Sequence, residues 1–308
     1  MGFYITGTSQ QYLTALENTQ TQMQKAQAQV SSGLRLQQAS DDPSAVAQIY
    51  QLQTTLAQNQ QTQNNLGNVQ TELSSADTAL QSAISNVQTA ITLASQGANT
   101  TLTAQDRTNL AGQVSQIMQS LVSLSNTNVN GSYIFSGDQA TQPSYQVDPT
   151  QPEGVKQLLT TTSTRVIQDV NGTAIAVAKT ASEIFDPQDS TTGGPATGNT
   201  FAAVNSLLTA LQNNDPAGVA QAATSLQNAS EYLNGQLAFY GAAENNVTNA
   251  TNLAKQFQTQ EQSSLSQVQD ANIPTAALAL TQAQTQEQAT LSVEAKIQQT
   301  PTLFSYLG

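Results

Sequence analysis

Residues 31–43 read SSGLRLQQASDDP and hold the densest run of charged and turn-forming residues in a chain that has little of either. Gly33 follows a helical pattern, at the position where a left-handed glycine commonly ends a helix. Asp42 before Pro43 has the order of an N-cap followed by proline at the first helical position. The stretch therefore predicts a break between two helices, with Gly33 ending the first and Asp42 and Pro43 starting the second.

The same stretch admits a chemical interpretation. Asp41 and Asp42 could form a carboxylate pair for acid–base work or for a divalent cation. No third or fourth acidic ligand lies nearby in the sequence. Capping explains both Asp42 and Pro43 and places negative charge where the helix dipole favours it, so we favour capping. Arg35 could pair with this acidic cluster, contact a neighbouring chain, or be a solvated charge.

Helical spacing extends on both sides of the break. A helix is predicted over residues 8–31, with a face of Tyr12, Leu16, Met23 and Val30. A longer helix is predicted over residues 43–96 and another up to about residue 126, each with an apolar seam at coiled-coil spacing. The seam residues are Leu66, Val69, Leu73, Leu80 and Val87 in the first, and Leu110, Val114, Ile117, Leu121 and Leu124 in the second.

The turn between these two helices carries its own signals. Gly97 is predicted to lie just past the helix end. Thr103 and Asp106 have the spacing of a capping box for the helix that follows.

The helical period is lost over residues 138–199. Apolar runs at 166–170 and 173–177 flank Asn171-Gly172, which is the strongest short signal for a β-hairpin. We therefore predict a small β-rich insert. Tyr133 and Phe135 precede it and could form a ligand platform, but we favour a role in closing the helical rod against the insert.

The C-terminal part mirrors the N-terminal part. Asp215 and Pro216 repeat the cap at Asp42 and Pro43, and a long helix is predicted over residues 216–270. Ile273-Pro274 breaks it, and a last helix runs to about residue 299. Its alanine-rich seam includes Leu280 and Leu291, and the chain then ends on an apolar segment containing Leu303, Phe304, Tyr306 and Leu307. We favour burial of that segment against the N-terminal helix or a neighbouring subunit over disorder.

The predicted fold class is mainly α: an elongated rod of long antiparallel helices with paired terminal helices and a small β-rich insert. Three domains are expected. Residues 1–42 with 273–308 form a terminal coiled coil, residues 43–137 with 200–272 form a helical rod, and residues 138–199 form the insert.

Composition narrows the function. Of 308 residues only 9% are charged, where about 25% is typical, and the net charge of −12 argues against nucleic-acid binding and a polybasic membrane anchor. No apolar run approaches about 18 residues, so no membrane segment is expected. The N-terminus does not read as a cleaved secretory signal. Cys and His are absent, and we predict no catalytic residue, no cofactor and no metal site. A neutral exterior suggests a protein that assembles.

The chain resembles the flagellin superfamily. Residues 31–48, SSGLRLQQASDDPSAVAQ, are similar to its N-terminal signature, in which a helix ends in Ser-Gly-x-Arg and resumes at an Asp-Asp pair. Pro43, residues 97–127 and residues 130–139, NGSYIFSGDQ, are similar to the hook–filament junction group of that superfamily. The resemblance covers residues 1–137 well, residues 200–308 more loosely and the insert hardly at all.

The resemblance implies a structural protein of the bacterial flagellum and no enzyme. It would be exported through the flagellar type III apparatus and would form a ring, outside the cell, between a hook-side junction protein and flagellin. An export chaperone would bind its C-terminal segment. The terminal helices would form an inner tube through subunit-assembly contacts, which involve Tyr12, Leu16, Met23, Val30, Arg35, Leu280, Leu291, Leu303, Phe304, Tyr306 and Leu307.

Two alternatives stay open. A short filament flagellin would share the helical core, although Pro43 and the Tyr133–Gly137 run argue against it. A secreted coiled-coil adhesin or effector is the other.

Overall fold

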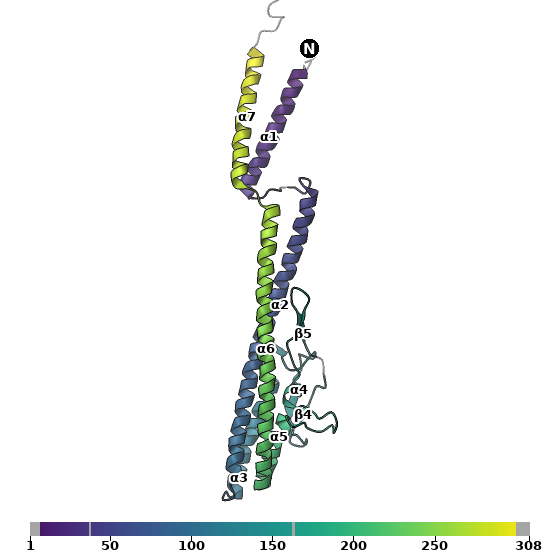
Figure 1. The fold of residues 1–308 in the computed structure, drawn as a ribbon, viewed down its shortest axis with the longest axis vertical. Helices are drawn as coiled ribbons and strands as arrows, with labels where there is room; N and C mark the ends of the chain where they lie inside the picture. Colours follow the sequence, from purple (N-terminus) through teal and green to yellow (C-terminus); the bar gives the residue numbers. More distant parts are fainter. Residues whose placement is uncertain (1–6, 37, 162–163, 300–308) are drawn as a thin grey trace, which may run out of the picture. The chain divides into compact units, whose positions relative to one another are not determined.

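The computed structural model describes residues 7–36, 38–161 and 164–299. Its helices are α1 (Gly7–Ser32), α2 (Pro43–Gly97), α3 (Ala104–Ser125), α4 (Ala181–Phe185), α5 (Thr200–Gln212), α6 (Pro216–Gln269) and α7 (Ile273–Gln299) (Figure 1). Its strands are β1 (Asn128–Val129), β2 (Ser132–Tyr133), β3 (Tyr145–Val147), β4 (Val155–Gln157), β5 (Val166–Gln168) and β6 (Ala174–Ala176). The mainly α fold class is confirmed, and the long helices begin and end within a residue or two of the predicted positions.

Contacts divide the chain into two compact units. The terminal unit comprises residues up to 58 and residues from 257 onward, and the central unit comprises residues 59–256. The three-domain division expected from the sequence stays a prediction.

The central unit is built on two seams of buried side chains that repeat every seven residues. A strict seven-residue apolar repeat is typical of coiled-coil packing. On α2 the seam is Leu66, Leu73, Leu80, Val87 and Ala94, and on α6 it is Val219, Leu226, Leu233, Tyr240, Val247 and Ala254. Buried alanines accompany both seams, at Ala76, Ala83 and Ala90 on α2 and at Ala222, Ala229, Ala243 and Ala250 on α6. Small side chains at these positions allow helices to approach closely.

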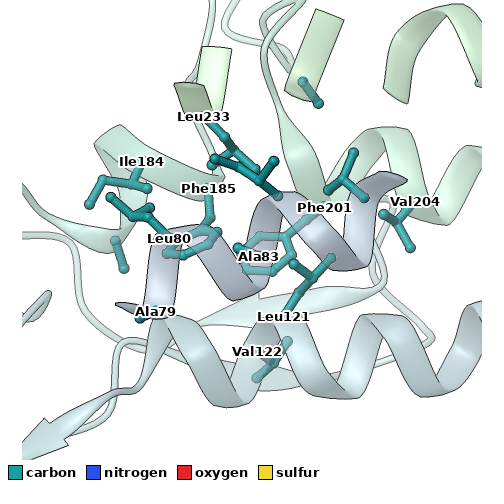
Figure 2. Packing of buried hydrophobic residues seen from close by; sticks show 14 of the residues in the cluster. Ala79, Leu80, Ala83, Leu121, Val122, Ile184, Phe185, Phe201, Val204 and Leu233 are labelled. Carbon is teal, nitrogen blue, oxygen red and sulfur yellow. The ribbon is translucent and has the colours of Figure 1, made fainter. Parts of the chain in front are cut away.

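One continuous cluster joins these seams to α3, α4 and α5. Figure 2 shows Leu80 and Ala83 of α2 beside Leu121 of α3, Phe185 of α4 and Phe201 of α5. Of the predicted seam residues, Val69 and Leu124 are partly buried against this cluster and the other eight are buried.

The β-structure consists of three separate two-stranded antiparallel ladders, β1–β2, β3–β4 and β5–β6. Asn130 and Gly131 both have positive φ between β1 and β2, and Gly172 has φ +80° between β5 and β6. Helix α4 lies between β6 and α5 and is not expected from the sequence. Its N-cap Thr180 and Glu183 form a capping box.

Gly97 does not lie past the end of α2 as predicted, because it is the last helical residue and its φ is not positive. A Cβ at Gly97 would lie 2.5 Å from Leu211 Cδ2, so the glycine allows α5 to approach closely.

Candidate assembly surface

Helices α1 and α7 pack against each other in the terminal unit and run antiparallel (Figure 1). The buried side chains between them are small: Thr19, Ala26, Ala276 and Ala283. The larger predicted residues Tyr12, Leu16, Met23, Val30 and Leu280 are half-buried. Gln20 Nε2 donates to Glu287 Oε1 at 3.5 Å, across the pair. Small buried residues give close packing but bury little apolar area, so this pair alone offers a narrow core.

Much apolar surface in the terminal unit faces solvent. Of the nine large hydrophobic side chains that are exposed in the described part of the chain, seven lie in this unit. They are Leu13, Tyr50, Phe257, Ile273, Leu278, Leu291 and Val293. Tyr50 is 67% exposed and Leu278 is 60% exposed. Beside Tyr50 lies a groove of about 200 Å³, lined in part by Leu36, Val46 and Ile49. Because most of the exposed large apolar side chains lie in this one unit, it is the candidate interaction surface.

The segment between α1 and α2 is hydrogen-bonded to the segment between α6 and α7. Gly33 has φ +73°, and its N–H donates to the Gln29 carbonyl to end α1. Leu34 then forms an antiparallel bridge with Asp270. The Arg35 N–H donates to the Gln269 carbonyl and the Ala271 N–H donates to the Gly33 carbonyl, both at 2.8 Å.

Arg35 finds its partners within the chain. Its Nε and Nη2 donate to the Val268 carbonyl at 3.2 and 3.0 Å, in the last turn of α6. A cation there satisfies a free carbonyl and matches the negative end of the helix dipole. Arg35 Nη1 also lies 3.7 Å from Asp42 Oδ2. This ion pair fits the predicted pairing of Arg35 with the acidic cluster, and contact with a neighbouring chain stays a prediction.

The two adjacent carboxylates serve different partners. Asp42 Oδ1 accepts from Ser44 Oγ at 2.8 Å and from the Ala45 N–H at 3.1 Å. These hydrogen bonds, the Ser44 bond first, hold the pKa of Asp42 below its usual value. Asp41 Oδ2 instead accepts from the Gln38 N–H, and its Oδ1 lies 3.7 Å from Lys25 Nζ. Asp42 therefore caps α2, with Pro43 as the first helical residue.

The other predicted caps lie at helix starts. The Thr103 side chain accepts from the Asp106 N–H at 3.2 Å, while Asp106 Oδ2 accepts from the Thr103 N–H at 3.2 Å. Asp215 Oδ1 accepts from the Ala217 N–H at 3.1 Å, next to Pro216 at the start of α6.

Phe135 lies where the helices meet the insert. It is fully buried and makes edge-to-face contacts with Phe185 of α4 and Tyr240 of α6, with ring centroids 6.0 and 6.1 Å apart. Tyr133 is half-buried, and its N–H donates to the Ala140 carbonyl.

Four predicted residues, Leu303, Phe304, Tyr306 and Leu307, lie outside the described residues, and Leu291 is exposed on α7. Within the described ranges no group of three or more acidic residues could hold a metal ion. No helix in those ranges is both long enough and apolar enough to cross a lipid bilayer.

Sequence reasoning missed Arg107, which is buried in α3. Its Nε donates to the Gly97 carbonyl, Nη2 to the Asn99 carbonyl, and Nη1 to the Leu102 carbonyl and to Asn214 Oδ1, at 2.6–3.0 Å. One guanidinium thus joins the end of α2, the following turn and the α5–α6 turn. The only sequence feature that could have drawn attention to Arg107 is its position directly after Asp106, a residue of the predicted capping box.

Comparison with known proteins agrees with this fold. Residues 6–140 match the family model of the bacterial flagellin N-terminal helical region. Over these residues the chain is similar to bacterial flagellins. Flagellar hook-associated protein 3 of Escherichia coli (strain K12) is 28% identical over 216 residues, which are 66% of this chain and 64% of that protein. Within the flagellin-like class, the chain resembles hook-associated protein 3.

Solved structures share the fold. A flagellar hook-associated protein from Vibrio parahaemolyticus has a TM-score of 0.64 at 21% identity and covers 75% of this chain and 100% of its own. The flagellar junction protein FlgL from Legionella pneumophila has a TM-score of 0.56 at 14% identity and covers 72% of this chain and 99% of its own.

Proposed function

We propose that this chain is a structural subunit of the bacterial flagellum that joins the hook to the filament. The observation that carries the proposal is a flagellin-like fold whose terminal unit leaves seven large apolar side chains exposed to solvent. The resemblance to hook-associated protein 3 and the fold shared with a flagellar junction protein support the junction role over other flagellar roles.

The terminal unit suits assembly with further copies of the same chain. Helix α1 carries only Glu17 and Lys25 as charged residues, and α7 carries only Glu287, Glu294 and Lys296. Charge repulsion between neighbouring copies is therefore small, and packing of copies would bury the exposed apolar side chains. The expected product is a ring that contacts a hook-side junction protein on one side and flagellin on the other.

The proposal includes export of the chain to the outside of the cell. The chain would pass unfolded through the flagellar type III apparatus and assemble outside the cell, with an export chaperone bound to the C-terminal segment that contains Leu303 and Phe304. No catalysis is assigned to it.

Deletion of the gene tests the junction role. We expect cells that keep hooks, lack filaments and release flagellin into the medium. Normal filaments on the deletion strain would contradict the proposal. Restoration by the intact gene is the control for effects on neighbouring genes.

A double variant tests the assembly surface. Leu278→Gln with Leu291→Gln removes two exposed apolar side chains of α7, and we expect an exported, folded protein that fails to restore filaments. Leu158→Gln with Val166→Gln changes two exposed side chains of the central unit and serves as the matched control. Equal motility of the two double variants would contradict the role of this surface.

The flagellin match at the N-terminus also fits a short filament flagellin. Polymerisation of the purified protein alone into long filaments would favour that function and overturn the junction role.

A further inference from the structure

A buried polar cluster lies in the central unit, away from the candidate assembly surface. Its centre is Asp186, which is 5% exposed and is the C-cap of α4. Tyr145 Oη donates to Asp186 Oδ2 at 2.8 Å, while Asn199 Nδ2 and Gln188 Nε2 donate to Asp186 Oδ1, both at 2.6 Å. These bonds join β3 to the segment that connects α4 and α5.

A second carboxyl group, that of Glu153, contacts the same cluster. Glu153, in the loop between β3 and β4, accepts from Gln188 Nε2 at 3.3 Å, so one side-chain amide serves two carboxyl groups. Because both carboxyl groups accept from the same amide nitrogen, they lie close together, and the charge of Asp186 acts on Glu153. A hydrogen bond between two carboxyl groups requires one of them to carry a proton.

Among the described residues, no ion pair with a lysine or an arginine is recorded for Glu153 or Asp186. The ion pairs recorded there involve Asp41, Asp42 and Glu72. Lys156 lies on β4 and acts on Asp148. The titratable group that donates to Asp186 is Tyr145, whose pKa is raised by burial first and then by the charge of Asp186. Tyr145 therefore stays neutral and keeps donating its proton.

The loop that carries Glu153 is seated tightly. Asn205 Nδ2 of α5 donates to the Pro152 carbonyl at 2.8 Å. Gly154 has φ +73°, and a Cβ there would lie 2.8 Å from Asn205 Oδ1 and 3.4 Å from Met118 Cε. Glu153 is thus held beside Asp186 by both of its neighbours.

We propose that Glu153 and Asp186 share one proton and form a clamp that fastens the β3–β4 hairpin to the segment between α4 and α5. When the proton is bound, the carboxyl pair is joined by a hydrogen bond. When the proton leaves, two anions face each other across Gln188, and the loop between β3 and β4 loosens.

The pH range follows from the environment of Glu153. Burial first, and then the hydrogen bond and charge of Asp186, raise the pKa of Glu153 to about 7 from its ordinary 4.5. The protonated form is therefore favoured in the folded state. The stabilising contribution is complete below pH 4.5 and is lost as the pH rises through about 7. The clamp thus releases close to neutral pH.

Carbon NMR of the full chain labelled at the glutamate side-chain carboxyl tests the proposal directly. We expect one glutamate signal with a midpoint near pH 7, absent from Glu153→Gln. Amide exchange of the unmodified chain, corrected for the intrinsic pH dependence, should show protection in residues 148–157 and 182–199 that falls between pH 6 and 8. The exchange measurement does not depend on the variant folding.

The variant sharpens the test, because a glutamine amide can donate to Asp186 at every pH. Glu153→Gln should remove the fall in protection and raise the melting temperature at pH 8 relative to the unmodified chain. Glu231→Gln, at an exposed position of α6, is the matched control and should change neither. If every glutamate titrates below pH 5.5, or if Glu153→Gln keeps the same pH dependence, the clamp does not exist.

Discussion

Arg107 shows at the residue scale how a buried charge can be satisfied without a carboxylate. It is 3% exposed, and the acceptors recorded for it are three backbone carbonyls and one side-chain amide oxygen. Two of the carbonyls, those of Gly97 and Asn99, lie at and just past the end of α2, where the helix dipole favours a cation. Its partner Asn214 is distant in the sequence, so no local pattern could have predicted the contact. The contact between Arg35 and the Val268 carbonyl also joins residues distant in the sequence, so no local pattern could have predicted it.

Replacing Arg107 by lysine should destabilise the central unit. Lysine keeps the charge but lacks the planar guanidinium group with which arginine contacts four acceptors. Buried carbonyls are therefore left unsatisfied. We expect a loss of about 2–4 kcal/mol in the free energy of unfolding, measured by urea denaturation. Lys156→Arg, at an exposed position of β4, is the control and should change stability little. Equal stability of both variants would contradict the role given to Arg107.

Two glycines of α2 should respond in opposite directions to alanine. Gly67 is exposed within the helix, and the position of an added Cβ is open space, so Gly67→Ala should stabilise by about 0.5–1 kcal/mol through helix propensity. Gly97→Ala places a methyl group against the buried Leu211 and should destabilise by about 1–3 kcal/mol. Thermal unfolding of the two single variants measures both, and a stabilised Gly97→Ala would show that α5 does not pack closely there.

At the element scale, most helix ends and the hairpin of the insert were predictable, and helix α4 was not. Asp42 with Pro43, and Thr103 with Asp106, are local signals, because the cap and the amide that it binds lie within three residues. The hairpin around Gly172 was predictable for the same reason. Helix α4 has only five residues and depends on burial of Ile184 and Phe185 in a cluster built from distant segments. The Glu153–Asp186 pair likewise joins residues far apart in the chain.

The α2 seam contains one polar position with a testable consequence. Asn59 lies seven residues before Leu66, is buried, and donates from Nδ2 to the Ala254 carbonyl of α6 at 3.0 Å. A buried asparagine in such a seam fixes register at a cost in stability.

We expect Asn59→Leu to raise the free energy of unfolding by about 1 kcal/mol, since burial of leucine contributes about 2 kcal/mol and the lost hydrogen bond costs about 1. Urea denaturation measures the change, and Leu66→Asn should show the reverse sign. Destabilisation by Asn59→Leu would mean that the hydrogen bond outweighs the apolar contact.

At the scale of the whole molecule, the seven-residue seams and the paired breaks at residues 33–42 and 270–272 made the mainly α class predictable. The flagellin resemblance was readable from residues 31–48 because that break is a local feature. The division of the chain into a terminal and a central unit was less predictable, since α2 and α6 are each continuous through the point where the contacts divide. Which apolar residues of the terminal unit are exposed could not be predicted from the sequence, because exposure depends on how the helices pack.

The central claim is that this chain occupies the joint between hook and filament. It is tested most directly by electron microscopy of intact flagella that carry an epitope tag in the exposed loop at Thr191 and Thr192. The account predicts gold-labelled antibody confined to a single band where the hook meets the filament. Label distributed along the filament, or flagella without label from cells that secrete the tagged protein, would contradict it.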